Sequence, residues 1–294
     1  MSIKIEDIVS LALSLVAIGL SVANLVDLYK MKTEKLVIPQ NLIDRNPGLG
    51  KWNIIHAYRG SYAHNTRLNP TDKFFIDDID TMGVCVPSKD YYLGLRTFHS
   101  SGTQEIKEEA WDIVIYEAKK AISLLAGGNP NILSLLWMNE DKYINVTSAG
   151  QLLLDNRELF SSKKIHKAFV GYGYGQLHKM TNQNFEGYMG DKRRQLFQSL
   201  GFDAKNASHS IRIFRMGIEM METGKLIVER PDAEELKAIK RGEWSLEKIR
   251  EETDRLKRRA DEVYETSKLP YDVDWGKINI LSIKVIETAW KEQN

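Results

Sequence analysis

Residues 76–86 read IDDIDTMGVCV, an apolar and β-branched run that ends before Pro87 and is typical of a β-strand. Side chains alternate between the two faces of a strand, so Asp78 and Asp80 share one face. Two carboxylates a few ångströms apart repel each other unless a divalent cation lies between them. The segment therefore predicts a metal site, with an exposed acidic sheet edge as the alternative.

Two further strands are predicted on either side of this one, at residues 53–59 (NIIHAYR) and 111–116 (WDIVIY). Asp112 opens the later strand and could present a third carboxylate to the same place. Three acidic groups around Mg²⁺ or Mn²⁺ suit phosphoryl transfer, in which one ion activates the attacking hydroxyl and another neutralises the triphosphate. We therefore expect Asp78, Asp80 and Asp112 to be both the metal ligands and the catalytic residues.

The first of these strands ends at Gly60-Ser61. A glycine lets the backbone approach a phosphate, and free N–H groups at the start of a following helix can bind phosphate oxygens. Neither Gly-Ser nor Asp-x-Asp is specific alone. Their order, strand with Gly-Ser, strand with Asp-x-Asp, then strand with Asp, is a much stronger signal for a nucleotide site.

From residue 128 onward helical signals dominate, with Asn129 as an N-cap before Pro130, and with Asp203 and Gly224 at the two ends of one helix. The fold class is therefore α+β: a small mixed-sheet domain followed by a helical domain that completes the cleft. Helices are predicted at 117–126, 151–160, 162–180, 191–200, 204–223, 231–240, 246–268 and 275–292. The expected domains are an apolar helix in 1–30, a linker at 31–50, a catalytic domain at 51–127 and the helical domain at 128–294.

The charges of the chain almost cancel, with 41 Lys and Arg against 40 Asp and Glu, so no global basic field points to nucleic acid. The single Cys85 excludes an intramolecular disulfide and a cysteine-based zinc site. A reducing cytosol is the expected surroundings for most of the chain.

These motifs resemble the bacterial and phage predicted nucleotidyltransferase family associated with RNA-repair pathways, within the DNA polymerase β superfamily. The resemblance covers about residues 52–250 and rests on Gly-Ser at 60–61, Asp-Asp-Ile-Asp at 77–80, Asp112, and the segments 116–120, 128–133, 172–176, 201–212, 217–219, 223–224 and 228. Three departures stand out. The stretch from Ser61 to Asp78 is longer than usual, Ser134 replaces an expected Glu, and the apolar N-terminal helix is not part of the pattern.

The resemblance implies transfer of a nucleoside monophosphate, AMP from ATP first among them, to an acceptor such as an RNA end, with release of pyrophosphate. It assigns the metals to the three aspartates and the β- and γ-phosphates to Gly60 and Ser61. Two alternatives remain open. The acceptor could be a protein hydroxyl or a small molecule, as in toxin–antitoxin relatives, or the chain could be a non-catalytic nucleotide- or RNA-binding scaffold.

Two helical stripes could form the opposite wall of the cleft. Lys205, His209 and Arg212 recur at helical spacing, as do Tyr172 and Gln176 on an earlier helix. Lys205 and Arg212 would bind triphosphate or acceptor phosphate, and Tyr172 could stack on a base. The alternative for both stripes is a solvated helix face.

Residues 8–26 form a run of 19 without a charge, close to the ~20 that cross a bilayer. Lys30, Lys32 and Lys35 follow and would keep the C-terminal side in the cytoplasm. The segment predicts a membrane tether for a cytoplasmic catalytic domain. The alternative is a buried helix that packs two copies into a homodimer.

Overall fold

The computed structural model describes residues 37–69, 72, 74–75, 78–99, 101–181 and 191–293. Contacts divide the chain into two compact units, Met1–Gln40 and Asn41–Asn294, and the second is the subject below. Residues 8–26, on which the predictions of a tether or a dimer helix fall, lie outside the described residues. Among the residues that are described, no helix is long and apolar enough to cross a membrane.

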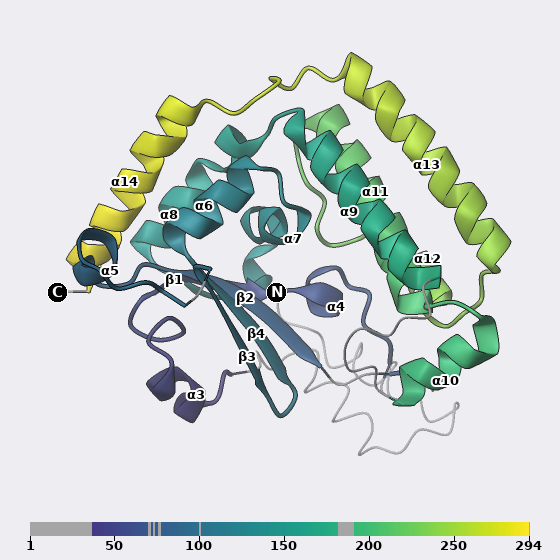
Figure 1. The fold of residues 1–294 in the computed structure, drawn as a ribbon, viewed down its shortest axis with the longest axis horizontal. Coiled ribbons are helices and arrows are strands. Elements are labelled where there is room, and N and C mark those ends of the chain that lie inside the picture. The colour runs from purple at the N-terminus through teal and green to yellow at the C-terminus, as the bar shows by residue number, and fades with distance from the viewer. Residues whose placement is uncertain are drawn as a thin grey trace, which may run out of the picture. The chain divides into compact units, whose positions relative to one another are not determined.

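The sheet has five strands in the order β3-β4-β2-β1-β5 (Figure 1). Their bounds are β1 Asn53–Tyr58, β2 Ile79–Cys85, β3 Thr103–Glu108, β4 Trp111–Glu117 and β5 Tyr143–Val146. Strands β2 and β4 are parallel, whereas the other neighbouring pairs are antiparallel. The sheet is therefore mixed, and the predicted α+β class is confirmed.

The central strands of the sheet are buried. All six residues of β1 are buried, and β2 is buried from Thr81 to its end at Cys85. Helices α6 (Ala118–Ala126) and α8 (Ser148–Asp155) pack against the sheet on one side (Figure 1). Helix α6 begins where Glu117 accepts hydrogen bonds from the N–H groups of Lys119 and Lys120.

The remaining helices form the second part of the unit. Two of the predicted helix ends are confirmed by their caps. The Asp203 side chain accepts from the N–H groups of Lys205 and Asn206, and Gly224 adopts the left-handed conformation with a φ of 73°. These helices are α7 Pro130–Leu133, α9 Lys164–Thr181, α10 Asp191–Leu200, α11 Ala204–Thr223, α12 Ala233–Lys240 and α13 Leu246–Thr266. The last helix, α14 Trp275–Glu292, instead packs against α8 and α6. The short helices α3 Gln40–Arg45, α4 Gly60–Ala63 and α5 Lys89–Leu93 lie earlier in the chain.

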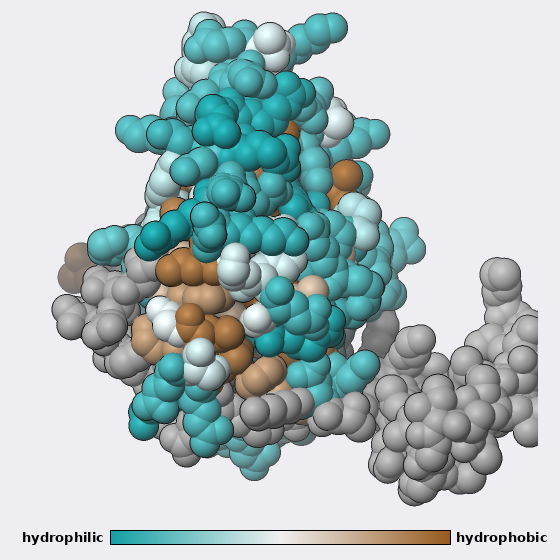
Figure 2. Space-filling model, turned by 90° about the vertical axis from the view of Figure 1, so that its right-hand side faces the viewer, coloured by the Kyte–Doolittle hydropathy of each residue, from teal (hydrophilic) through white to brown (hydrophobic). Residues whose placement is uncertain are grey.

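Helix α11 lies at the centre of this part and packs against α9, α12 and α13. A Cβ added at Gly217 of α11 would lie 2.8 Å from the Cβ of Phe169 on α9, so the close approach of these helices requires a glycine. The Ser210 hydroxyl donates to the Gly173 carbonyl at 2.9 Å and joins the same two helices. Helix α13 covers α11 with one apolar stripe and turns hydrophilic side chains outward (Figure 2).

One sequence prediction is corrected here, and one strand was missed. The helix expected at 151–160 is instead α8, which starts earlier because Thr147 caps it by accepting from Gly150 N–H, followed by a 3₁₀ turn at Arg157–Phe160. Strand β5 was not predicted, because the strand has only four residues and none of them is fully buried. Residues 91–109 contain part of α5 and strand β3, which pairs with β4 as a hairpin.

Candidate active site

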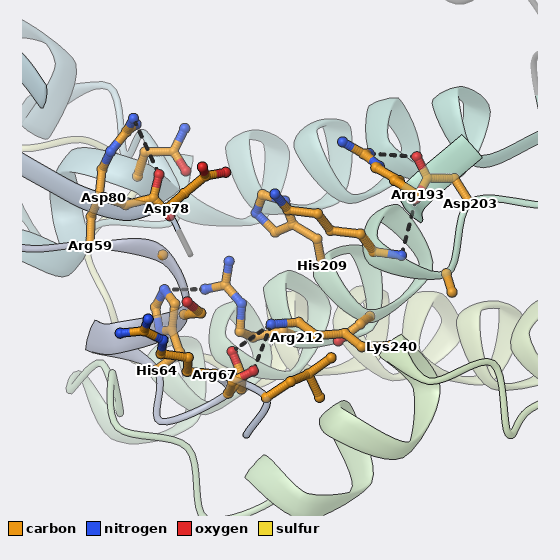
Figure 3. Close-up of a pocket in the computed structure, with 18 of the residues that line it drawn as sticks. Arg59, His64, Arg67, Asp78, Asp80, Arg193, Asp203, His209, Arg212 and Lys240 are labelled. Carbon is orange, nitrogen blue, oxygen red and sulfur yellow. Dashed lines mark hydrogen bonds and ion pairs between the residues drawn. The ribbon is translucent and has the colours of Figure 1, made fainter. Parts of the chain in front are cut away.

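A pocket of about 290 Å³ lies between the end of the sheet and helices α11 and α12 (Figure 3). This volume is near the lower end of the range for small-molecule sites. Most of the predicted site residues line it: Gly60, Ser61, Asp78, Asp80, Tyr172, Lys205, His209 and Arg212. Asp112 and Gln176 are not among the lining residues.

Gly60 fits tightly against the first aspartate of β2. Its φ is 61°, a conformation that side chains with a Cβ rarely adopt. A Cβ at this position would lie 2.3 Å from Asp80 Oδ2. The Arg59 N–H donates to the Asp80 carbonyl at 2.8 Å, so the backbone before Gly-Ser is fixed to β2. The predicted Gly-Ser turn and the Asp-x-Asp strand are therefore in direct contact.

Asp80 and Asp112 are brought together by the parallel pairing of β2 and β4, in which their Cα atoms are register partners. Burial raises the pKa of Asp80, and the nearby Asp112 and Asp78 carboxylates raise it further, against opposing effects of Arg59 and Lys205. The negative charge at Asp80 is therefore costly without a neighbouring cation.

Arg59 supplies that cation in this structure. Its Nη2 lies 2.8 Å from Asp112 Oδ1 and 3.8 Å from Asp80 Oδ1. All three side chains are about one quarter to one third exposed. Sequence reasoning missed Arg59, although its position directly before Gly-Ser was the available signal.

The donor set suits a hard divalent cation, since carboxylate oxygens are the ligands that Mg²⁺ and Mn²⁺ prefer. In the part of the chain that the structure describes, no group of three or more His, Cys, Asp or Glu side chains is close enough to hold a metal ion. The guanidinium between Asp80 and Asp112 nevertheless identifies a position where two carboxylates face one positive centre. Asp78, next to Asp80 at the pocket wall (Figure 3), is the candidate third ligand.

The opposite side of the pocket is cationic. Arg212 is buried, and its Nη1 donates to His64 Nε2. His64 Nδ1 lies 2.8 Å from the Val228 carbonyl and donates to it, which leaves Nε2 as the acceptor. Burial, then the Arg212 charge, holds the pKa of His64 well below its usual value, so the imidazole is neutral. Burial, then Arg230, lowers the pKa of Arg212 to about 9. None of the described carboxylates forms a direct ion pair with Arg212.

Lys240, at the end of α12, is a second, half-buried cation of this side that sequence reasoning missed. Its Nζ donates to the Thr66 carbonyl at 2.8 Å and to Thr66 Oγ1 at 3.0 Å. Burial lowers its pKa to about 7, and Arg212 and Lys205 contribute to the decrease. No spacing pattern connects a lysine at position 240 with a loop at position 66, so the sequence held no signal for this contact.

The two residues of the predicted α9 stripe lie in different places: Tyr172 lines the pocket, whereas Gln176 does not. The Tyr172 hydroxyl accepts from Asn131 Nδ2 at 2.9 Å, and the Tyr172 ring centroid lies 5.6 Å from that of His209. His209 Nε2 is buried without a hydrogen-bond partner in the described structure, and burial holds the pKa of His209 well below its usual value. Gln176 is buried away from the pocket. Lys205 is exposed at the pocket mouth.

A bidentate ion pair joins Arg193 of α10 to Asp203, the cap of α11 (Figure 3). Arg193 and Asp203 both line the pocket. The pair fixes the start of α11 against α10, so Lys205 is held where it can face an anion.

Comparison with known proteins assigns the chain to a family. No curated protein matches the chain, but a family model does. The family model described as RlaP, RNA repair pathway DNA polymerase beta family, matches residues 75–279, which is well over half of the chain. The matched segment includes the three aspartates and the cationic helices, whereas Gly60 and Ser61 lie before it. The family predicted from the motifs is confirmed: the chain belongs to the RlaP family of RNA repair pathway DNA polymerase β proteins.

Proposed function

We propose that this chain is a metal-dependent nucleotidyltransferase with a polymerase β-like fold, which moves AMP from ATP to a hydroxyl or phosphate at an RNA end. The observation that carries the proposal is the charge pattern of one pocket. Asp78 and Asp80 line one side of it, and Arg212, Lys240 and Lys205 line the other. A triphosphate with its divalent cation needs both kinds of group.

Each residue has a distinct role in this proposal. Asp78, Asp80 and Asp112 would hold Mg²⁺ or Mn²⁺, which neutralises charge on the triphosphate and activates the acceptor oxygen. Gly60 and Ser61 would bind the β- and γ-phosphates, and the cationic side would bind further phosphate oxygens. The acceptor oxygen forms a bond to the α-phosphorus as the bond to the β-phosphate oxygen breaks. Pyrophosphate leaves, and the proton of a hydroxyl acceptor passes to water.

The helical part would complete the cleft. Tyr172 on α9, His209 on α11 and Lys240 on α12 all line the pocket, so the sheet and the helical part contribute to the same site. Neutral His209, with its unpartnered Nε2, is suited to hydrogen bonding with a base or ribose.

The test is incubation of the protein with each α-³²P-labelled NTP, Mg²⁺ and total RNA, and then with lysate. Label on RNA, lost in Asp80→Asn and retained in the surface control Asp155→Asn, supports the proposal. Label on protein or on a small molecule would replace RNA as the acceptor. Nucleotide binding without transfer under all these conditions would indicate a scaffold.

A further inference from the structure

Arg59 is the only cationic side chain among the described residues that forms direct ion pairs with the proposed metal ligands. Its Nη2 lies between carboxylate oxygens of Asp80 and Asp112, at 3.8 and 2.8 Å. Its Nε is buried and has no hydrogen-bond partner in the described structure. The guanidinium is thus held mainly by these two carboxylates.

The backbone and the side chain of Arg59 are anchored separately. The N–H is bonded to the Asp80 carbonyl within the β1–β2 pairing region, so the main chain is fixed. The side chain lines the pocket and can leave the carboxylates without disturbing the Gly-Ser turn. A divalent cation and this guanidinium would require the same oxygen atoms, and both cannot use them at once.

We propose that Arg59 is a positioning residue that substitutes for the metal ion in the metal-free protein. It neutralises Asp80 and Asp112 until a divalent cation takes its place. This inference rests on the proposed metal site. It predicts that Arg59 competes with the cation, so removal of the guanidinium tightens metal binding and destabilises the metal-free state.

The experiment measures Mn²⁺ binding by electron paramagnetic resonance without nucleotide, in the wild type, Arg59→Met, Arg59→Gln and Arg59→Lys. We expect the Kd for Mn²⁺ to fall by about tenfold in Arg59→Met and Arg59→Gln, which corresponds to an ion pair of about 1.4 kcal/mol. Arg59→Lys restores the charge and should return the Kd toward the wild-type value. The matched control is Arg45→Met, which removes an arginine that pairs at 2.8 Å with Glu108 outside the pocket, and it should leave the Kd unchanged.

A second readout is the Tm in EDTA and in Mn²⁺. Arg59→Met should lower the Tm in EDTA, because two neighbouring carboxylates lose their counter-charge, and Mn²⁺ should raise the Tm of this variant more than that of the wild type. An equal or weaker Mn²⁺ affinity in Arg59→Met and Arg59→Gln overturns the inference, as does wild-type Mn²⁺ binding by Asp80→Asn. If the Kd for Mn²⁺ and the Tm change as predicted but the protein transfers no nucleotide from any NTP, the proposed function is overturned and the role of Arg59 still holds.

Discussion

The two sides of the pocket are built in opposite ways. The acidic side comes from neighbouring strands, where backbone pairing sets Asp80 beside Asp112, and its carboxylates are partly exposed and paired with Arg59. The cationic side joins the loop that carries His64 and Thr66 to helices α11 and α12, which follow much later in the chain. Arg212 there is buried, Lys240 is half-buried, and both have neutral partners. The first side is a local product of sheet geometry, whereas the second exists only after the helices have packed. Variants on the two sides should therefore differ in what they disturb.

The largest expected effect is at the acidic side. Asp80→Asn, and equally Asp78→Asn, should lower kcat by about a thousandfold or more, equivalent to about 4 kcal/mol of transition-state stabilisation. The fold should persist, and the Tm should hold or rise. Asp80→Asn removes a partly buried charge whose pKa is raised by burial, and Asp78→Asn removes the repulsion between the two neighbouring carboxylates. Single-turnover transfer assays and thermal melts measure both quantities. Near wild-type activity in either variant would contradict the assignment of that aspartate as a metal ligand.

A smaller loss of activity is expected from a substitution at Gly60. Comparison with a control glycine separates the catalytic effect from the effect of backbone strain. Gly60→Ala places a Cβ against Asp80 Oδ2 in a left-handed conformation, so transfer should fall by about a hundredfold, roughly 2.7 kcal/mol. Gly201→Ala is the matched control, since Gly201 has a φ of 75° and nothing within 4 Å of the added Cβ. Both variants should lose about 1–2 kcal/mol of stability from the backbone strain, and only Gly60→Ala should lose activity. Equal activities would show that the contact with Asp80 is unimportant.

On the cationic side, Lys205→Ala and Arg212→Ala should weaken binding more than they slow chemistry. Each loses a charge-assisted hydrogen bond of roughly 1.5–3 kcal/mol, which appears as a ten- to hundredfold rise in KM for NTP or acceptor. Arg215→Ala on the same helix is the control, because Arg215 pairs with Asp232, Glu235 and Glu252 outside the pocket. It should lower the Tm and leave KM unchanged. Wild-type kinetics in both test variants would show that this face of α11 is a structural or solvated helix face and not a binding surface.

The smallest effect concerns pH. The pKa of Lys240 is lowered to about 7 from an ordinary value of 10.5, so the folded protein loses this charge as the pH rises through 7. ATP binding should therefore weaken between pH 6 and pH 8.5 more steeply in the wild type than in Lys240→Gln, as isothermal titration calorimetry can measure. Between about pH 7 and 10.5 and without nucleotide, Lys240 is protonated in the unfolded chain and neutral in the folded protein. Its contribution therefore makes the free energy of unfolding rise with pH across that window. Parallel pH profiles of the two proteins would contradict this assignment.

The acidic side could be predicted from sequence because its determinants are short-range. Period-two alternation predicted that Asp78 and Asp80 lie together, and both line the pocket, although Asp78 lies just before β2, which begins at Ile79. One further strand supplied Asp112. The ends of α11 could also be predicted, since Asp203 and Gly224 act on the residues next to them. Helical spacing alone could not separate Tyr172, which lines the pocket, from Gln176, which packs away from it.

The remaining contacts depend on packing over long sequence separations. Arg212 and His64 are 148 positions apart, and Lys240 and Thr66 are 174 apart. No local pattern encodes such pairs, because each partner has an ordinary neighbourhood in the sequence. His64 lies three positions after Ser61 of the Gly-Ser turn, which is the only local signal for it, and Lys240 has no motif near it.

The buried end of β2 provides an internal probe of this architecture. Cys85 is the only cysteine in the sequence, has no exposed surface, and has its thiol pKa raised by burial and by Glu117. A thiol-specific reagent can reach it only when the strand that carries Asp80 opens, so the rate of modification counts those opening events. Saturating nucleotide or divalent cation should slow that rate, and the logarithm of the decrease is proportional to the free energy by which the ligand stabilises the closed strand. A chain with a single sheltered sulfur can thus report ligand occupancy by reaction kinetics, without any added label.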